Sequence, residues 1–207
     1  MSVTLEQYTA RDQLDIMSAT RAVDEAQLPL PRSTFRALGD ATLRAGVKEL
    51  LRAEGRTLIE TPSGFTSGYD NDVRRALTAD GIGVLSAEER AVLTLVLLHC
   101  VAIPRADGRI PPERADDWTH AVPVHPETLR NCRHLTDSSI ADATRRLRDA
   151  DILAYGAQRL IKPGPQFHRL TPEVIADLYD DLVLLAEPNG MLAESIQRRR
   201  TREGTPS

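Results

Sequence analysis

The chain has 207 residues, of which 41% are hydrophobic and 4% aromatic, with 30 acidic and 26 basic side chains and a net charge of −4. This hydrophobic content predicts a folded chain and excludes wholesale disorder. The scarcity of aromatic residues argues against a base-stacking RNA platform, and the acidic balance argues against a protein that coats nucleic acid by bulk positive charge.

Only two cysteines are present, Cys100 and Cys132, so we expect no disulfide framework of the kind that small secreted domains need. The first residues show no basic leader followed by an apolar stretch. The most apolar run covers 91–103, and its about 13 residues fall short of the roughly 20 that span a bilayer. We therefore expect a soluble, cytoplasmic protein that does not enter a membrane.

The first third of the chain predicts three helices followed by a β-hairpin. Asp40 is suited to cap the third helix, and Gly55 to end it. Ser33 is the expected cap of the short second helix. The hairpin is indicated by β-branched and aromatic residues on both sides of the turn Pro62-Ser63-Gly64. The expected ranges are 5–26, 33–38 and 40–54 for the helices and 57–69 for the hairpin.

The remainder of the chain begins with a helix at 72–80 and then repeats this order. Ser86 and Glu89 form a capping box that opens an apolar helix. A helix over 137–151 has an apolar stripe that consists of Ile140, Ala143, Leu147 and Ala150. The other expected elements are a helix ending at 103, a loop at 106–124, a short helix at 125–133, a hairpin at 153–170 that turns at 162–165, a helix at 171–185 and a tail from 188.

A helix, a short helix, another helix and a hairpin thus occur twice, about 100 residues apart. Phe65 follows the first hairpin turn, and Phe167 follows the expected second one. This is the organisation of a winged-helix domain, and two copies account for the length without a long loop. We expect a mainly α fold with short β-hairpins, divided into winged-helix modules at 1–80 and 81–187 and a basic, flexible tail at 188–207.

The second copy resembles the winged-helix superfamily in detail. Residues 136–140 look like the start of a recognition helix, and residues 145–153 look like its end and the beginning of the wing. Asp151 stands where these proteins usually have glycine, a residue that readily adopts positive φ. The resemblance covers 86–171 with fair specificity, whereas for 8–69 it depends mainly on the order of elements.

The tandem arrangement also resembles the kleisin-interacting tandem winged-helix (KITE) subunits of bacterial SMC complexes, such as the MukE-like and ScpB-like proteins. The likeness is architectural, and no diagnostic motif of that family is visible. It implies a non-enzymatic homodimer that binds a kleisin segment or another SMC-complex subunit, with DNA contacts that are secondary and mostly to the DNA backbone. The alternative is a winged-helix transcriptional regulator that binds a specific DNA site, which the second copy alone suggests equally well.

Candidate DNA contacts lie on the face of the 137–151 helix opposite its core stripe, and on the wing. The same face carries Asp142 and Asp149, which favour surface ion pairs with the arginines over base reading. Phe65 and Trp118 are candidate partner contacts, although for each residue we favour the alternative that it anchors a core. The candidate DNA-binding residues are Ser138, Arg145, Arg148, Arg159, Lys162 and Arg169.

No catalytic, metal or cofactor site is indicated. Cys132 and His134 are near each other, and His99 and Cys100 are adjacent, but neither pair has the spacing of a zinc site. We expect no enzyme activity and no cofactor. The acidity lies outside the two helix-and-wing segments: 32–69 carries +2, 125–170 carries +3 and the arginine-rich 194–207 carries +2. Local DNA contact is therefore compatible with the overall negative charge.

Overall fold

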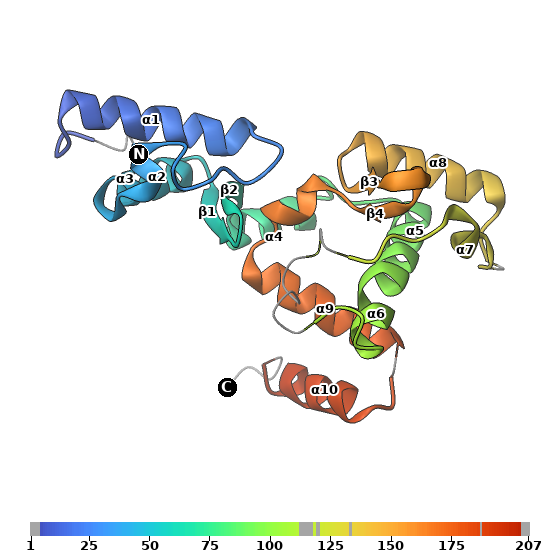
Figure 1. Cartoon of the computed structure of the whole chain (residues 1–207). Helices are drawn as coiled ribbons and strands as arrows, with labels where there is room; N and C mark the ends of the chain where they lie inside the picture. The colour runs from blue at the N-terminus through green and yellow to red at the C-terminus, as the bar shows by residue number, and fades with distance from the viewer. Residues whose placement is uncertain (1–4, 112–117, 119–120, 133, 187, 204–207) are drawn as a thin grey trace. The chain divides into compact units, whose positions relative to one another are not determined.

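The computed structural model describes residues 5–111, 118, 121–132, 134–186 and 188–203. The prediction of a mainly α fold with short hairpins is confirmed, since helices dominate and the strands form two separate two-stranded antiparallel sheets (Figure 1). The chain divides into two compact units. Unit 1 comprises Met1–Val84 and Pro165–Thr171, and unit 2 comprises Leu85–Gly164 and Pro172–Ser207.

Unit 1 begins with helix α1, followed by a short helix, a longer helix and a hairpin. The Asp40 carboxylate accepts hydrogen bonds from the backbone N–H groups of Thr42 and Leu43, as expected for the cap of α3. Gly55 then ends this helix with φ of +72°. The elements are α1 (Ala10–Glu25), α2 (Arg36–Gly39), α3 (Ala41–Ala53), β1 (Arg56–Thr61), β2 (Gly64–Tyr69) and α4 (Asn71–Ala79), and the 3-10 segment η5 (Pro165–Arg169) also belongs to this unit.

The core of unit 1 lies between its first three helices and the hairpin. Before α2, Leu30 forms an antiparallel bridge with Phe65 on β2, with N···O distances of 2.7 and 2.8 Å. The bridge fixes the extended segment against the hairpin, and the Phe65 ring fills the core. The buried cluster consists of Ile16, Ala19, Val23, Ala37, Leu38, Leu43, Val47, Leu51 and Phe65.

Unit 2 repeats this order. The capping box of Ser86 and Glu89 is present, and the helix that it opens continues through a π-helical turn before it ends. Thr136 caps α8 by accepting from the Ser139 N–H. The elements are α5 (Ala87–Leu97), η1 (Leu98–Ala102), α6 (Ile103–Ala106), α7 (Pro126–Arg130), α8 (Asp137–Asp149), β3 (Leu153–Tyr155), η4 (Ala157–Arg159), β4 (Ile161–Pro163), α9 (Pro172–Ala186) and α10 (Met191–Glu203).

The core of unit 2 is organised around α5, which packs against α8 and β4. Val124 precedes α7 and forms an antiparallel bridge with Ile161 on β4, with both N···O distances at 2.8 Å. This bridge occupies the same place in the order of elements as the bridge between Leu30 and Phe65. Fully or nearly fully buried side chains of this unit include Val92, Val96, Leu97, Cys100, Leu129, Leu147, Leu153 and Ile161.

The second hairpin differs from the sequence prediction. Its strands pair Leu153 with Pro163 and Tyr155 with Ile161, so the turn lies at 156–160 and not at 162–165. Gly164 is instead required for a close approach, because a Cβ there would lie 2.4 Å from the Asp151 carbonyl oxygen. The predicted second strand forms η5, and Phe167 is therefore not the counterpart of Phe65.

Three smaller predictions also differ from the structure. Ser33 does not cap the second helix, whose N-cap is Phe35 without a side-chain hydrogen bond. Ala150, which the sequence assigns to the buried stripe of α8, is exposed. Thr144 is buried on this helix instead, together with Ala143 and Leu147. In the segment expected to be a flexible tail, Met191–Glu203 forms α10. Among the residues described, no helix is long and apolar enough to cross a membrane.

Candidate nucleic-acid interface

Helix α8 presents the candidate residues Ser138, Arg145 and Arg148 because its opposite face is fixed in the core. Ile140, Ala143 and Leu147 are at most 5% exposed, and they hold α8 against α5. Ser138 and Arg145 are exposed, and Arg148 is half-buried. The Ser138 hydroxyl lies 3.0 Å from that of the capping Thr136, so the helix start places it at the surface.

Carboxylates accompany each arginine of α8. Arg145 donates to Asp142 at 2.9 Å, and Arg148 donates to Asp149 at 2.8 Å. The Asp149 carboxylate raises the pKa of Arg148. These pairs leave the helix face nearly neutral, which weakens its attraction for a phosphate backbone compared with unpaired arginines.

The second hairpin adds an aromatic contact beside the end of α8. The Tyr155 ring is 40% exposed, and the guanidinium carbons of Arg148 and Arg159 lie 5.6 and 5.7 Å from its centroid. Gln158 and Arg159 both have positive φ, at 55° and 59°, which costs non-glycine residues backbone energy. The strained turn thus brings one cation of the second hairpin to the same ring as a cation of α8.

Lys162 does not lie at the tip of the second hairpin, as the predicted turn at 162–165 implies. It is half-buried within β4, opposite Ala154 on β3. Arg159 is the exposed basic residue of the turn itself. Among the described residues of the second hairpin, the cation suited to reach a ligand is therefore Arg159, with Lys162 set back along the strand.

Arg169 was predicted to contact DNA, but the structure assigns it a structural role in unit 1. Its guanidinium donates to the carbonyl oxygens of Asp24 and Ala26, both at 2.8 Å, and to the carbonyl oxygen of Ser67 at 3.0 Å. Burial and the neighbouring Arg56 lower the pKa of Arg169, although the residue stays cationic. Because its donors are committed to backbone acceptors, Arg169 anchors η5 to the hairpin and α1.

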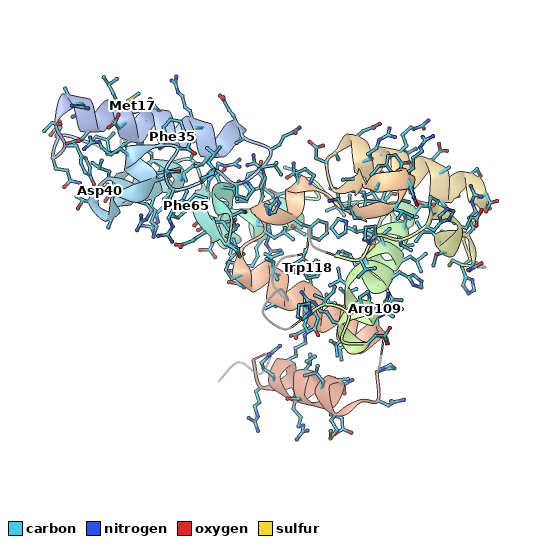
Figure 2. All side chains as sticks on the ribbon, in the orientation of Figure 1. Met17, Phe35, Asp40, Phe65, Arg109 and Trp118 are labelled. Carbon is cyan, nitrogen blue, oxygen red and sulfur yellow. The ribbon has the colours of Figure 1, made fainter. Side chains whose placement is uncertain are left out.

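Phe65 and Trp118, the predicted partner contacts, are both buried (Figure 2). Phe65 is 1% exposed, and Arg32 and Arg44 cover its ring at 5.3 and 5.4 Å. Trp118 is 2% exposed and lies 5.6 Å from the guanidinium of Arg105. Each therefore anchors the core of its unit, which is the alternative role that the sequence analysis gave for both residues. Neither presents a surface for a partner.

The part of unit 1 that corresponds to α8 and the wing is less suited to nucleic acid. Along α3 the exposed Lys48 and Arg52 alternate with the exposed Glu49. The tip of the first hairpin consists of Pro62 and Ser63, which carry no charge. The two units thus share an arrangement of elements but present different chemistry at the equivalent place.

The cysteines and histidines do not assemble a reactive or metal-binding centre within the described part of the chain. Cys100 is buried and donates to the Ile161 carbonyl oxygen at 3.4 Å, and burial raises the pKa of its thiol to about 12. A thiol with this pKa is a poor nucleophile near neutral pH. No three His, Cys, Asp or Glu side chains among the described residues are placed to hold a metal ion.

Two features of the interface were missed from the sequence. Tyr155 was not a candidate, although an aromatic residue at the start of a wing that follows an arginine-rich helix end is a usable signal. The bridges of Leu30 and Val124 were also missed, because one residue of extended chain carries no periodicity.

No model of a known protein family matches the chain, and a search of the curated proteins gave no match.

Proposed function

We propose that this protein is a non-enzymatic, DNA-associated tandem winged-helix protein that acts as a KITE-like accessory subunit of a bacterial SMC or condensin-type complex. In this role it forms a homodimer, binds a kleisin-type segment, and contacts the DNA backbone through α8 and the wing of unit 2.

The observation that carries this proposal is the repeated bridge. In each unit, one residue between the first and second helices pairs with the second strand of the hairpin, through Leu30 and Phe65 in one and Val124 and Ile161 in the other. A winged-helix domain has its first strand at this place in the order, paired with the strand that returns from the wing. Two such units in one chain support the tandem winged-helix assignment and, through it, the KITE-like role.

The charge pattern favours a scaffold over a protein that reads bases. A base-reading helix inserts its exposed side chains into the major groove, where carboxylates face the phosphates on both sides. The exposed arginines of α8 share their face with Asp142 and Asp149. Backbone contact through Arg148 and Arg159 is compatible with this pattern, and the neutral tip of the first hairpin is suited to protein contact.

A second candidate is a transcriptional regulator that binds one DNA site. The observation in its favour is the wing, where the exposed Arg159 lies 5.7 Å from the centroid of the exposed Tyr155 ring. At a single DNA site, the guanidinium groups of Arg148 and Arg159 are suited to contact the phosphate backbone, and the aromatic ring beside them is suited to contact the adjacent groove.

A DNA-binding experiment tests the shared part of both candidates. Arg148→Ala combined with Arg159→Ala is expected to weaken binding to a random 20-base-pair duplex about tenfold and to reduce the slope of log K against log salt by about 2. Arg75→Ala with Arg109→Ala removes two other exposed arginines and serves as the control. Unchanged affinity and slope in the first variant would exclude the assigned interface.

A second measurement separates the candidates. Selection from random duplexes is expected to give no preferred site, whereas a regulator prefers its site by about 10³-fold or more. The scaffold role also predicts a dimer by light scattering and co-purification of a large coiled-coil ATPase with its kleisin from the native cell. A monomer at high concentration that co-purifies with neither protein would refute the scaffold role.

A further inference from the structure

Helices α9 and α10 of unit 2 form a pair of opposite charge that the winged-helix arrangement does not require. Figure 1 shows α10 beside α9, and the two helices are in contact. Helix α9 carries Glu173, Asp177, Asp180 and Asp181 and no basic residue. Helix α10 carries four arginines within five positions, at 198, 199, 200 and 202.

The acids of α9 hold specific arginines of α10. Arg199 is bonded to the carboxylate of Asp180, whose side chain is only 12% exposed. Arg200 pairs with Asp181 at 2.8 Å. The hydrogen bond to Asp181 raises the pKa of Arg200, and Asp180 and Asp177 add to the shift. The two aspartates thus provide one carboxylate to each of two neighbouring guanidinium groups, and phosphate groups of a nucleic acid are anions that can take the same place.

We propose that α10 is a second nucleic-acid-binding element, whose arginines contact the phosphate backbone, and that Asp180 and Asp181 of α9 hold it in a closed state by occupying Arg199 and Arg200. Duplex DNA competes with these aspartates, so binding of DNA to α10 requires the helix to leave α9.

The docked helix is held weakly enough for such competition. Among the side chains of this helix that the structure describes, those buried to 3% exposure or less are Ala193 and Ile196. A helix of this length is marginal by itself, so its position depends on these two side chains and on the ion pairs. Ion pairs are also the contacts that a polyanion replaces most directly. Arg198 and Arg202 lie outside these two ion pairs and supply the first encounter with DNA, and the contact of Arg198 with Glu194 on its own helix, at 3.7 Å between exposed side chains, is open to competition by phosphate.

The composition of α10 favours a nucleic acid over a membrane surface. The apolar residues of α10 are confined to its first six positions, where Ala193 and Ile196 pack inward and Met191 and Leu192 are exposed, whereas a helix that lies in a lipid interface needs a broad apolar face along its length. All four cations are arginine, whose planar fork binds two phosphate oxygens together. The site lies outside α8 and the wing, so it does not depend on the interface proposed above.

The affinity of the full-length protein for a random 20-base-pair duplex tests the closed state. Asp180→Asn with Asp181→Asn keeps the shape of both side chains and removes their charge, and we expect it to raise affinity about threefold to tenfold. Glu6→Gln with Glu25→Gln removes the same charge from exposed positions of unit 1 and is the control. An affinity that rises no more than in the control would overturn the proposal.

The two arginines of α10 that lie outside the ion pairs with Asp180 and Asp181 test the ligand contact. Arg198→Gln with Arg202→Gln leaves both ion pairs to α9 intact, and we expect it to weaken DNA binding and reduce the salt slope by about 2. The double variant Arg148→Ala and Arg159→Ala is also expected to bind DNA more weakly. Adding Arg198→Gln and Arg202→Gln to it is expected to weaken binding further, by the same factor as in the wild type. Loss in one variant and not the other therefore separates failure of this proposal from failure of the wing interface.

Movement of the helix is measured with a thiol at its buried face. Ala193→Cys in a Cys132→Ser background places a cysteine at a position that is 0% exposed, while the native Cys100 remains buried and slow to react. We expect duplex DNA to increase the labelling rate of Cys at 193 at least threefold. An unchanged labelling rate would refute the release of α10. An increase with anionic phosphatidylserine vesicles but not with DNA would refute the assignment of a nucleic acid as the ligand of α10.

Discussion

Replacing Arg169 by alanine distinguishes the structural role of this residue from the DNA contact that the sequence predicted. The side chain donates four hydrogen bonds within unit 1, to three carbonyl oxygens and to the Ser67 hydroxyl at 3.2 Å. A hydrogen bond from a charged group contributes about 1.5–3 kcal/mol when buried. Because Arg169 is only half-buried, water replaces part of this loss, and we expect a cost of about 2–3 kcal/mol.

The two units allow the loss to be located. The one tryptophan, Trp118, belongs to unit 2, so its fluorescence follows that unit, whereas circular dichroism at 222 nm follows helices in both. We expect Arg169→Ala to lower the melting temperature of the part of the dichroism transition that belongs to unit 1 by about 8–24 °C and to leave the fluorescence transition nearly in place. Arg159→Ala, at an exposed position, is the control and is expected to stay within about 0.5 kcal/mol of the wild type.

A melting temperature unchanged in Arg169→Ala, together with a weakened affinity for DNA, would refute this reasoning. It would mean that the guanidinium is free to leave the carbonyl groups of Asp24, Ala26 and Ser67, and that the sequence-based assignment was the better one. Equal shifts in both transitions would instead refute the assignment of Arg169 to unit 1 alone.

Three further predictions test packing, capping and ionisation. Gly68→Ala places a Cβ 2.1 Å from the Arg169 carbonyl oxygen, so thermal unfolding should show a loss of about 1–3 kcal/mol, whereas Gly39→Ala meets only an ordinary contact at 3.5 Å and should show little. Asp40→Ala removes the acceptor for two backbone N–H groups at the start of α3 and should cost about 1 kcal/mol in urea unfolding, with Asp40→Asn close to wild type. Cys100 should resist thiol reagents at pH 8 while Cys132 reacts. Because burial raises the folded-state pKa of Cys100 to about 12, its contribution to stability should be complete below about pH 8.5 and lost as the pH rises toward 12, which pH-dependent unfolding of Cys100→Ala checks.

The helices and the first hairpin follow from signals that act over a few residues. Asp40, Ser86 and Thr136 accept from backbone groups two or three residues further on, so the caps they form are encoded locally. The turn at Pro62 and Ser63 likewise depends on its own residues. Apolar spacing also placed Ile140 and Leu147 on the buried face of α8.

The second hairpin shows where local signals are ambiguous. Proline and glycine at 163–165 indicate a turn, yet glycine is equally needed where another backbone approaches, and this is its role at Gly164. The actual turn contains Gln158 and Arg159 at positive φ, a conformation that neither residue type indicates. Asp151 likewise adopts φ of 57° in the place where glycine was expected.

The candidate site divides in the same way. Periodicity alone placed Arg145 and Arg148 on the outward face of α8, because a helix repeats every 3.6 residues whatever surrounds it. The fate of Arg169, Phe65 and Trp118 depended on contacts with residues distant in sequence, such as Asp24 with Arg169 across 145 positions. The sequence by itself thus determined the helices, their caps and their exposed charges. Only the tertiary structure decided which arginine is held by carbonyl oxygens, which aromatic rings are enclosed, and that the arginines of α10 lie on the acids of α9, because each of these depends on long-range packing.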